Sequence, residues 1–269
     1  MDALKLRLKG TWTAGDFGKI AKSYNTGSIE FIDRLQINAG ERVLDIACGT
    51  GNLAIPAAKR GANVAGIDIA PNLVEQAKER ALEEGVKVNF VEGDAEQLPY
   101  EDQSFDKVVT MFGAMFAPRP EIVTSEMLRV TRSGGTIAMA NWTPSGFAGQ
   151  MFKLIGSFVP PSSLMPSPTQ WGDPAKVRER FGDRVSSLNC VPRMISLQFD
   201  GMNPTEVIEF WRQFYGPTQR AFEALEGNPE KQAELRQALE QHFSKNNKAQ
   251  QPGNICIESE YLEVTAVRK

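Results

Sequence analysis

The residues best placed to do chemistry are three acids and two glycines that follow apolar stretches of the chain. Asp45 ends the apolar stretch RVL, and the chain then runs through IACGTGN. Glycine has no Cβ and a freely accessible φ, so Gly49 and Gly51 would let a ligand lie against the backbone. The helix expected after the turn would offer unpaired N–H groups to that ligand. The turn therefore predicts a site for a small molecule.

The positions of the acids indicate what that molecule carries. Asp45 precedes the glycines, where a carboxylate attracts a cationic group such as the ammonium of a methionine tail and repels a pyrophosphate. Asp68 ends the second apolar stretch, where a carboxylate can accept hydrogen bonds from both hydroxyls of a ribose. Asp94 follows the third stretch, where an acid can accept the amino group of adenine. Together the acids suit an adenosyl group with a cationic tail.

The glycine turn alone leaves a second interpretation open. Residues 49–54, GTGNLA, also fit the G-x-G-x-x-G/A pattern of dinucleotide-binding enzymes. Asp68 would serve the ribose of NAD equally well. An NAD-dependent oxidoreductase is therefore an alternative at this point.

The elements that must position these residues alternate between strands and helices. Between residues 41 and 142, short apolar stretches are separated by segments with apolar residues at helical spacing. Such alternation implies right-handed βαβ connections and a parallel sheet with helices on both faces. We therefore predict an α/β, doubly wound, Rossmann-like fold, in which the carboxyl ends of the strands bring the three acids to one edge.

The rest of the chain is predicted to add a cap and a lid. After Trp142 the alternation stops, and Asn203, Pro204 and Glu206 have the arrangement of a capping box at the start of a helical region. A long insertion between two strands is often a functional lid. We predict one domain, 1–269, with a helical cap at 1–40, a cofactor-binding βα core at 41–142, a sixth strand within 143–200, a helical lid insertion at 201–253 and a last strand at 258–268.

Composition excludes several other classes. A formal net charge of -3 creates no field that would attract nucleic acid or anionic lipid. The chain has neither the apolar core of a signal peptide nor an apolar run that spans a bilayer, so we expect a cytoplasmic protein without nucleic-acid or membrane partners. The cysteines (48, 190, 256) are far apart and His242 is the only histidine. We therefore expect no metal site, and we place His242 on the solvated face of a polar helix.

Four segments, in order, resemble the class I S-adenosylmethionine-dependent methyltransferases, and in particular the ubiquinone and menaquinone C-methyltransferase group. They are DIACGTGN (45–52), GIDIAPNLVEQAKER (66–80), VEGDAEQLPYEDQSFDKVV (91–109) and LRVTRSGGTIAMANW (128–142). The resemblance implies a mostly parallel seven-stranded sheet with an antiparallel last strand, and S-adenosylmethionine as cofactor. A protein that binds this cofactor without methyl transfer is a further alternative.

The resemblance also implies which residues contact the cofactor. Gly49 and Gly51 would contact it through the backbone, Asp45 would face the methionine ammonium, and Asp68 would bind the ribose. Carried over residue by residue, the expected cofactor set is Tyr24, Asp45, Ala47, Gly49, Gly51, Asp68, Ile69, Asp94, Ala95, Met111 and Phe112.

Aromatic residues outside the βα repeats predict a lidded cavity for a small, apolar or aromatic acceptor. The expected lining is Trp12, Phe17, Phe116, Trp142, Phe147, Phe152, Trp171, Trp211 and Tyr215. Met115 and Phe116 stand where many members of the family carry histidines or other polar groups, so we assign no catalytic base. Methyl transfer to protein or RNA is the alternative, and both a monomer and a homodimer remain open.

Overall fold

Residues 3–269 are described by a computed structural model, and their core is a βα repeat. Its strands and helices are β1 (Arg42–Ile46), α4 (Ala54–Lys59), β2 (Asn63–Asp68), α5 (Pro71–Glu83), β3 (Val88–Glu92), β4 (Phe105–Met111), α6 (Pro120–Val130) and β5 (Thr131–Trp142). The strands of this repeat are apolar because helices cover both faces of a parallel sheet. Leu44, Ile46 and Val108 are fully buried, as such a sheet requires.

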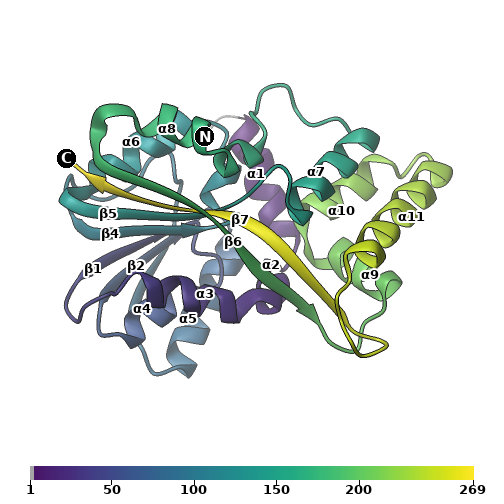
Figure 1. Ribbon diagram of the computed structural model, residues 1–269, viewed down its shortest axis with the longest axis horizontal. Helices are drawn as coiled ribbons and strands as arrows, with labels where there is room; N and C mark the ends of the chain where they lie inside the picture. Colours follow the sequence, from purple (N-terminus) through teal and green to yellow (C-terminus); the bar gives the residue numbers. More distant parts are fainter. Residues whose placement is uncertain (1–2) are drawn as a thin grey trace.

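The seven strands form one sheet in the order β3-β2-β1-β4-β5-β7-β6. The first five are parallel, and β7 (Ile255–Arg268) runs antiparallel between β5 and β6 (Val185–Phe199). Helices α3 (Asn25–Arg34), α4 and α5 lie on one face, and α6 and α8 (Pro174–Phe181) lie on the other (Figure 1). The predicted Rossmann-like fold with an antiparallel last strand is confirmed.

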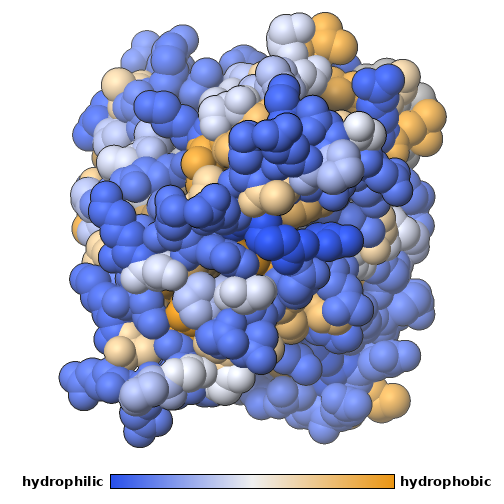
Figure 2. Space-filling view, turned by 90° about the vertical axis from the view of Figure 1, so that its right-hand side faces the viewer, coloured by the Kyte–Doolittle hydropathy of each residue, from blue (hydrophilic) through white to orange (hydrophobic). Residues whose placement is uncertain are grey.

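The chain between β6 and β7 forms three helices, α9 (Pro204–Phe214), α10 (Gly216–Ala224) and α11 (Pro229–Asn246). The Asn203 side chain accepts from the Glu206 N–H, and the Glu206 side chain accepts from the Asn203 N–H, as in a capping box. These helices and α7 (Phe147–Phe158) lie beyond the carboxyl ends of the parallel strands (Figure 1). Figure 2 shows the outer face on this side as largely hydrophilic, with scattered hydrophobic side chains.

The N-terminal segment joins the insertion to the core. It consists of α1 (Ala3–Ala14), α2 (Phe17–Ala21), a short 3₁₀ turn at Lys22–Tyr24, and α3; the first two residues of the predicted cap lie outside the described ones. Helix α1 packs against both α10 and α5. The Arg220 guanidinium donates to the Gly10 carbonyl, and the Asn72 amide donates to the Gly15 carbonyl. Helix α1 therefore bridges the insertion and the βα core.

Three details of the sequence interpretation differ from the structure. Residues 147–158 form α7, which the Gly-, Pro- and Ser-rich composition of the region concealed, and α8 was also missed. The last strand begins at Ile255, three residues before its expected start. His242 is not on a solvated face, because its ring stacks on Phe147 at 4.4 Å and its Nε2 lies 3.1 Å from the Phe147 carbonyl oxygen.

No helix within residues 3–269 combines the length and the apolar character that crossing a membrane requires.

Candidate functional site

The glycine turn after β1 is bent in a way that needs small residues. Gly49 and Gly51 have φ of 53° and 82°. A Cβ on Gly51 would lie 2.9 Å from the Phe90 ring, so this position is closed to side chains. Ala47 also has a positive φ, 54°, although it is not a glycine. Positive φ values in residues that carry a side chain are concentrated at functional sites. The turn is therefore a candidate functional site and not merely a connection between β1 and α4.

The acids at the tips of β1 and β2 are buried together behind this turn. One Asp68 oxygen accepts from the Gly49 N–H at 2.8 Å and the other accepts from the Ala70 N–H at 2.9 Å. Asp45 accepts from the Ala54 N–H at 3.1 Å, at the start of α4. These bonds hold both carboxylates at the carboxyl edge of the sheet.

The pKa values of both acids are raised. Burial raises the pKa of Asp68 more than the hydrogen bonds from the Ala70 and Gly49 N–H groups lower it. Burial also raises the pKa of Asp45 well above its ordinary value, against the hydrogen bond from Ala54, and the charge of Asp68 raises it further. A cation placed beside them would favour their ionised forms.

A cavity of about 760 Å³, its mouth included, lies over the turn and the tips of β1, β2, β3 and β4. Most of the expected cofactor residues line it: Ala47, Gly49, Asp68, Ile69, Asp94, Ala95, Met111 and Phe112. Tyr24 and Asp45 line a smaller cavity behind it, together with Ala47, Gly49 and Met111. Gly51 lines neither the large cavity nor the smaller one, because it lies inside the turn.

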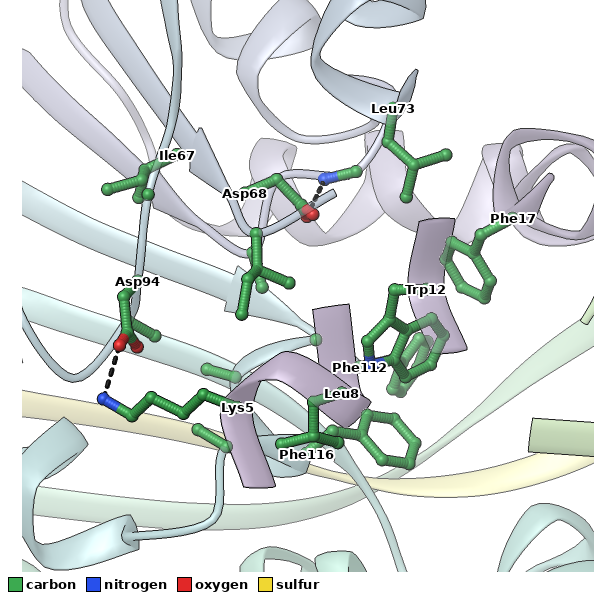
Figure 3. A pocket seen from close by; sticks show the side chains of 18 of the residues that line it. Lys5, Leu8, Trp12, Phe17, Ile67, Asp68, Leu73, Asp94, Phe112 and Phe116 are labelled. Carbon is green, nitrogen blue, oxygen red and sulfur yellow. Dashed lines mark hydrogen bonds and ion pairs between the residues drawn. The ribbon is translucent and has the colours of Figure 1, made fainter. Parts of the chain in front are cut away.

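Helix α1 contributes a residue to this cavity that the sequence did not reveal. The Lys5 ammonium lies 2.5 Å from Asp94 and 2.8 Å from Glu96, and Figure 3 shows it reaching across the cavity mouth. One helical turn further on, Lys9 pairs with Glu92. The only signal was the spacing of the two lysines, which places them on one face of a helix but does not identify their partners.

The tip of β4 is fitted closely against the tip of β1. A Cβ on Gly113 would lie 2.5 Å from the Ala47 Cβ and 2.8 Å from its carbonyl oxygen. The preceding residue, Phe112, has φ of 56°, and its ring lies parallel to Trp142 with centroids 3.5 Å apart. The strained backbone at Phe112 therefore aims its ring at the end of β5.

An aromatic chamber lies beyond Phe112, and its empty space, with the open mouth included, is about 400 Å³. Six of the expected acceptor residues line it: Phe17, Phe116, Trp142, Phe152, Trp211 and Tyr215. Tyr24 and Phe112, expected to contact the cofactor, also line it, and Ile20, Ala148, Met151 and Leu197 complete it. Trp12 lines the larger cavity, where its ring meets Phe17 and Phe116 edge-on (Figure 3).

Two expected acceptor residues are packed elsewhere. Phe147 faces α11, between the rings of His242 and Phe243. Trp171 is buried under the Arg180 guanidinium, 4.3 Å from the ring centroid. Neither belongs to the lining of the chamber or of the larger cavity, because both serve to dock helices onto the core.

Sequence comparison identifies the class of protein. Residues 43–135 match the profile of a family described as a methyltransferase domain. A Mycobacterium tuberculosis H37Rv protein, described as uncharacterized, is 34% identical over 265 residues, which is 97% of this chain and 94% of that one. A demethylmenaquinone methyltransferase from Renibacterium salmoninarum is 35% identical over 116 residues, 43% of this chain and 47% of its own.

Solved structures share the fold. The YcgJ protein of Bacillus subtilis superposes with a TM-score of 0.59 at 20% identity, over 91% of this chain and 99% of that one. An N-methyltransferase 2 of Haemonchus contortus, in complex with phosphomonomethylethanolamine and S-adenosylhomocysteine, superposes with a TM-score of 0.57 at 19% identity, over 90% of this chain and 52% of that one.

The chain belongs to the class I S-adenosylmethionine-dependent methyltransferases, and its cofactor is S-adenosylmethionine. The residues present fit this cofactor. The turn at Gly49 leaves backbone exposed to the cavity, and Asp68 and Asp94 line the same space. Asp45 lies in the adjoining cavity, where its buried carboxylate suits a cationic tail.

Proposed function

We propose that this methyltransferase acts on a small, apolar or aromatic molecule held in the aromatic chamber. One observation carries the proposal: the chamber and the large cavity share Phe17, Phe112 and Phe116. A ligand in the chamber would therefore lie directly beside a cofactor in the large cavity. A protein or RNA chain would need a basic or open groove, and the chamber is aromatic and covered by helices instead.

We assign the cofactor contacts as follows. Asp68 accepts from the ribose hydroxyls, and Asp94 with the Ala95 N–H reads the adenine edge. Ile69 packs against the adenine ring. Asp45 faces the methionine tail in the smaller cavity, with the Met111 carbonyl close to the ammonium. Tyr24 lines both that cavity and the aromatic chamber, so it lies where the methionine tail and the acceptor meet.

When bound, the cofactor supplies an electrophilic methyl group on a sulfonium. The side chains of the protein hold the acceptor close to that methyl and in line with it, which replaces a bimolecular encounter by a fixed geometry. Phe112 and Trp142 exclude water and present π faces, which favour a neighbouring cation. Helices α1 and α9 cover the site, since Trp12 of α1 and Trp211 of α9 both meet Tyr215.

Two measurements test the proposal. Calorimetry should detect binding of S-adenosylhomocysteine and none of NADH. A panel of small aromatic compounds, incubated with methyl-labelled cofactor, should give a labelled small product, whereas total protein and RNA extracts should not become labelled. Label transferred to a macromolecule in preference to the small compounds would contradict the assignment.

A further inference from the structure

The aromatic chamber contains polar groups that can donate hydrogen bonds to a ligand. The indole N–H of Trp211 is buried and has no hydrogen-bond partner within residues 3–269. The phenols of Tyr24 and Tyr215 line the same chamber and are 5% and 3% exposed. A buried donor without a partner costs free energy, and a ligand that brings an acceptor into the chamber would remove that cost. The chamber is therefore suited to a ligand that carries a hydrogen-bond acceptor.

Within residues 3–269, the lining of this chamber holds no side chain that could take up a proton. Apart from the three donors, its described lining is hydrocarbon, aromatic or thioether: Phe17, Ile20, Phe112, Phe116, Trp142, Ala148, Met151, Phe152 and Leu197. Burial raises the pKa of both Tyr24 and Tyr215, so both phenols stay neutral and donate at physiological pH. A protonated nucleophile would have no base here.

The titratable groups of the adjoining cavity are engaged by the backbone. Asp45 and Cys48 line the adjoining cavity with Tyr24, where Asp45 accepts from the Ala54 N–H and the Cys48 thiol lies 3.8 Å from the Gly49 carbonyl oxygen. His242 lies outside the chamber lining, with its ring stacked on Phe147 and its Nε2 at the Phe147 carbonyl. None of these groups is therefore placed to take the proton of an acceptor in the chamber.

We propose that the chamber binds aromatic acceptors as their anions, phenolates or thiophenolates, which Tyr24, Tyr215 and Trp211 hold by hydrogen bonds. This inference rests on the proposed function. The acceptor gives its proton to bulk water before binding. Its oxygen or sulfur lone pair then forms the bond to the methyl carbon as the carbon–sulfur bond of the cofactor breaks, and that electron pair stays on the cofactor sulfur. Two opposite charges are neutralised in an apolar space, which the exclusion of water favours.

Binding without turnover gives a direct test. 4-Nitrophenol changes its visible absorbance on ionisation, and sinefungin carries a positive charge near the sulfonium position without a transferable methyl. In the complex of protein, sinefungin and 4-nitrophenol, we expect the pKa of the bound nitrophenol to fall below its value in water. Y24F and Y215F should each weaken binding of the anion about tenfold, as expected for loss of a hydrogen bond to a charged group.

Y100F is the matched control for those variants. It removes a buried phenol hydroxyl that packs beside Phe105, away from the chamber lining, and should leave nitrophenol binding unchanged. A bound nitrophenol that stays neutral would overturn the proposal, as would Y24F and Y215F variants that bind the anion as tightly as the parent protein.

The pH dependence of turnover separates this proposal from base catalysis. With a series of 4-substituted phenols and thiophenols, the midpoint of the kcat/KM profile should move with the pKa of each acceptor. A midpoint that is the same for all acceptors would indicate a protein base such as Asp45 and overturn the inference, as would preferential methylation of aliphatic amines or alcohols.

Calorimetry with S-adenosylhomocysteine distinguishes a failure of the anionic-acceptor proposal from a failure of the proposed site. If the protein binds S-adenosylhomocysteine but fails the nitrophenol test, the anionic acceptor is wrong and the methyltransferase site stands. If the protein does not bind S-adenosylhomocysteine, the proposed site itself fails.

Discussion

The Lys5 ammonium of α1 lies 2.5 Å from a carboxylate oxygen of Asp94 at the end of β3, across 89 positions of sequence. Burial lowers the pKa of Lys5, but its hydrogen bonds to Asp94 and Glu96 outweigh that effect and the pKa is raised. The pair closes α1 over the cavity mouth (Figure 3). Since Asp94 is also the proposed partner of the adenine amino group, the helix and the cofactor would share the same carboxylate.

Replacing Lys5 should loosen α1. In K5M the ammonium is gone and Asp94 and Glu96 repel each other, so the helix loses one of its attachments to the core. We expect backbone amides of residues 3–14 to exchange with solvent about tenfold faster, with little change elsewhere. Hydrogen exchange followed by mass spectrometry measures this directly.

K78M is the control for K5M. Lys78 pairs with Glu75 within its own helix α5, so its loss should leave exchange in α1 unchanged. Unchanged exchange of residues 3–14 in K5M would show that hydrophobic packing, and not the ion pair, holds the helix.

The glycine turn after β1 could be predicted because the sequence features that indicate it are local. Gly49, Gly51 and the acids stand at fixed positions relative to their own strand ends, and parallel strands bring those ends together. The Lys5–Asp94 pair could not be predicted in this way. The helical spacing of Lys5 and Lys9 defines a basic face, but only the tertiary fold selects which acids it meets.

The lining of the aromatic chamber was predicted less completely for a related reason. An aromatic residue in a sequence carries no sign of the direction in which its ring points. Phe147 and Trp171 are as apolar as Phe116, yet they pack against α11 and Arg180. Helix α7 was missed because glycines, prolines and serines flank an apolar stretch, and that stretch packs against α11 and β7, which are distant in sequence.

Asp45 should destabilise the unliganded protein and favour cofactor binding. Its carboxylate is 1% exposed and lies near Asp68, so its charge is costly without a cation. We expect D45N to raise the free energy of unfolding by roughly 1–2 kcal/mol at neutral pH and to weaken S-adenosylmethionine binding by about tenfold or more.

Urea denaturation and calorimetry measure the two effects of D45N. D183N, at an exposed position, is the control and should change neither. A D45N protein that is less stable than the parent would show that the Asp45 carboxylate is a structural requirement of the turn.

Cofactor affinity should increase with pH. Burial raises the pKa of Asp45 and Asp68 in the unliganded protein, and a bound cation favours their ionised forms. Affinity should therefore be weak below the raised pKa values, rise as pH increases through them, and level off above. Within that range binding should release protons, and calorimetry in two buffers of different ionisation enthalpy detects that release.

Stability of the unliganded protein should have the opposite dependence. Between the ordinary aspartate pKa of 3.8 and the raised values, the folded state holds more protons than the unfolded chain. These two groups therefore make stability fall as pH rises through that range, and their effect is constant above it. Affinity that does not vary with pH, without proton release, would contradict the ionised state assigned to the bound form.

Gly113 should tolerate no side chain, because it lies where the tips of β1 and β4 meet. In G113A the new Cβ would lie 2.5 Å from the Ala47 Cβ and 2.8 Å from the Ala47 carbonyl oxygen, so one strand tip must shift. We expect the free energy of unfolding to fall by roughly 1–3 kcal/mol, as for other overpacked sites. Because the shift displaces the backbone at Ala47 and Phe112, S-adenosylhomocysteine should also bind more weakly.

G227A makes the same substitution where no heavy atom lies within 4 Å, so it should affect neither stability nor binding. If G113A and G227A changed stability and binding equally, the loss of glycine flexibility, and not the contact with Ala47, would explain the effect of G113A.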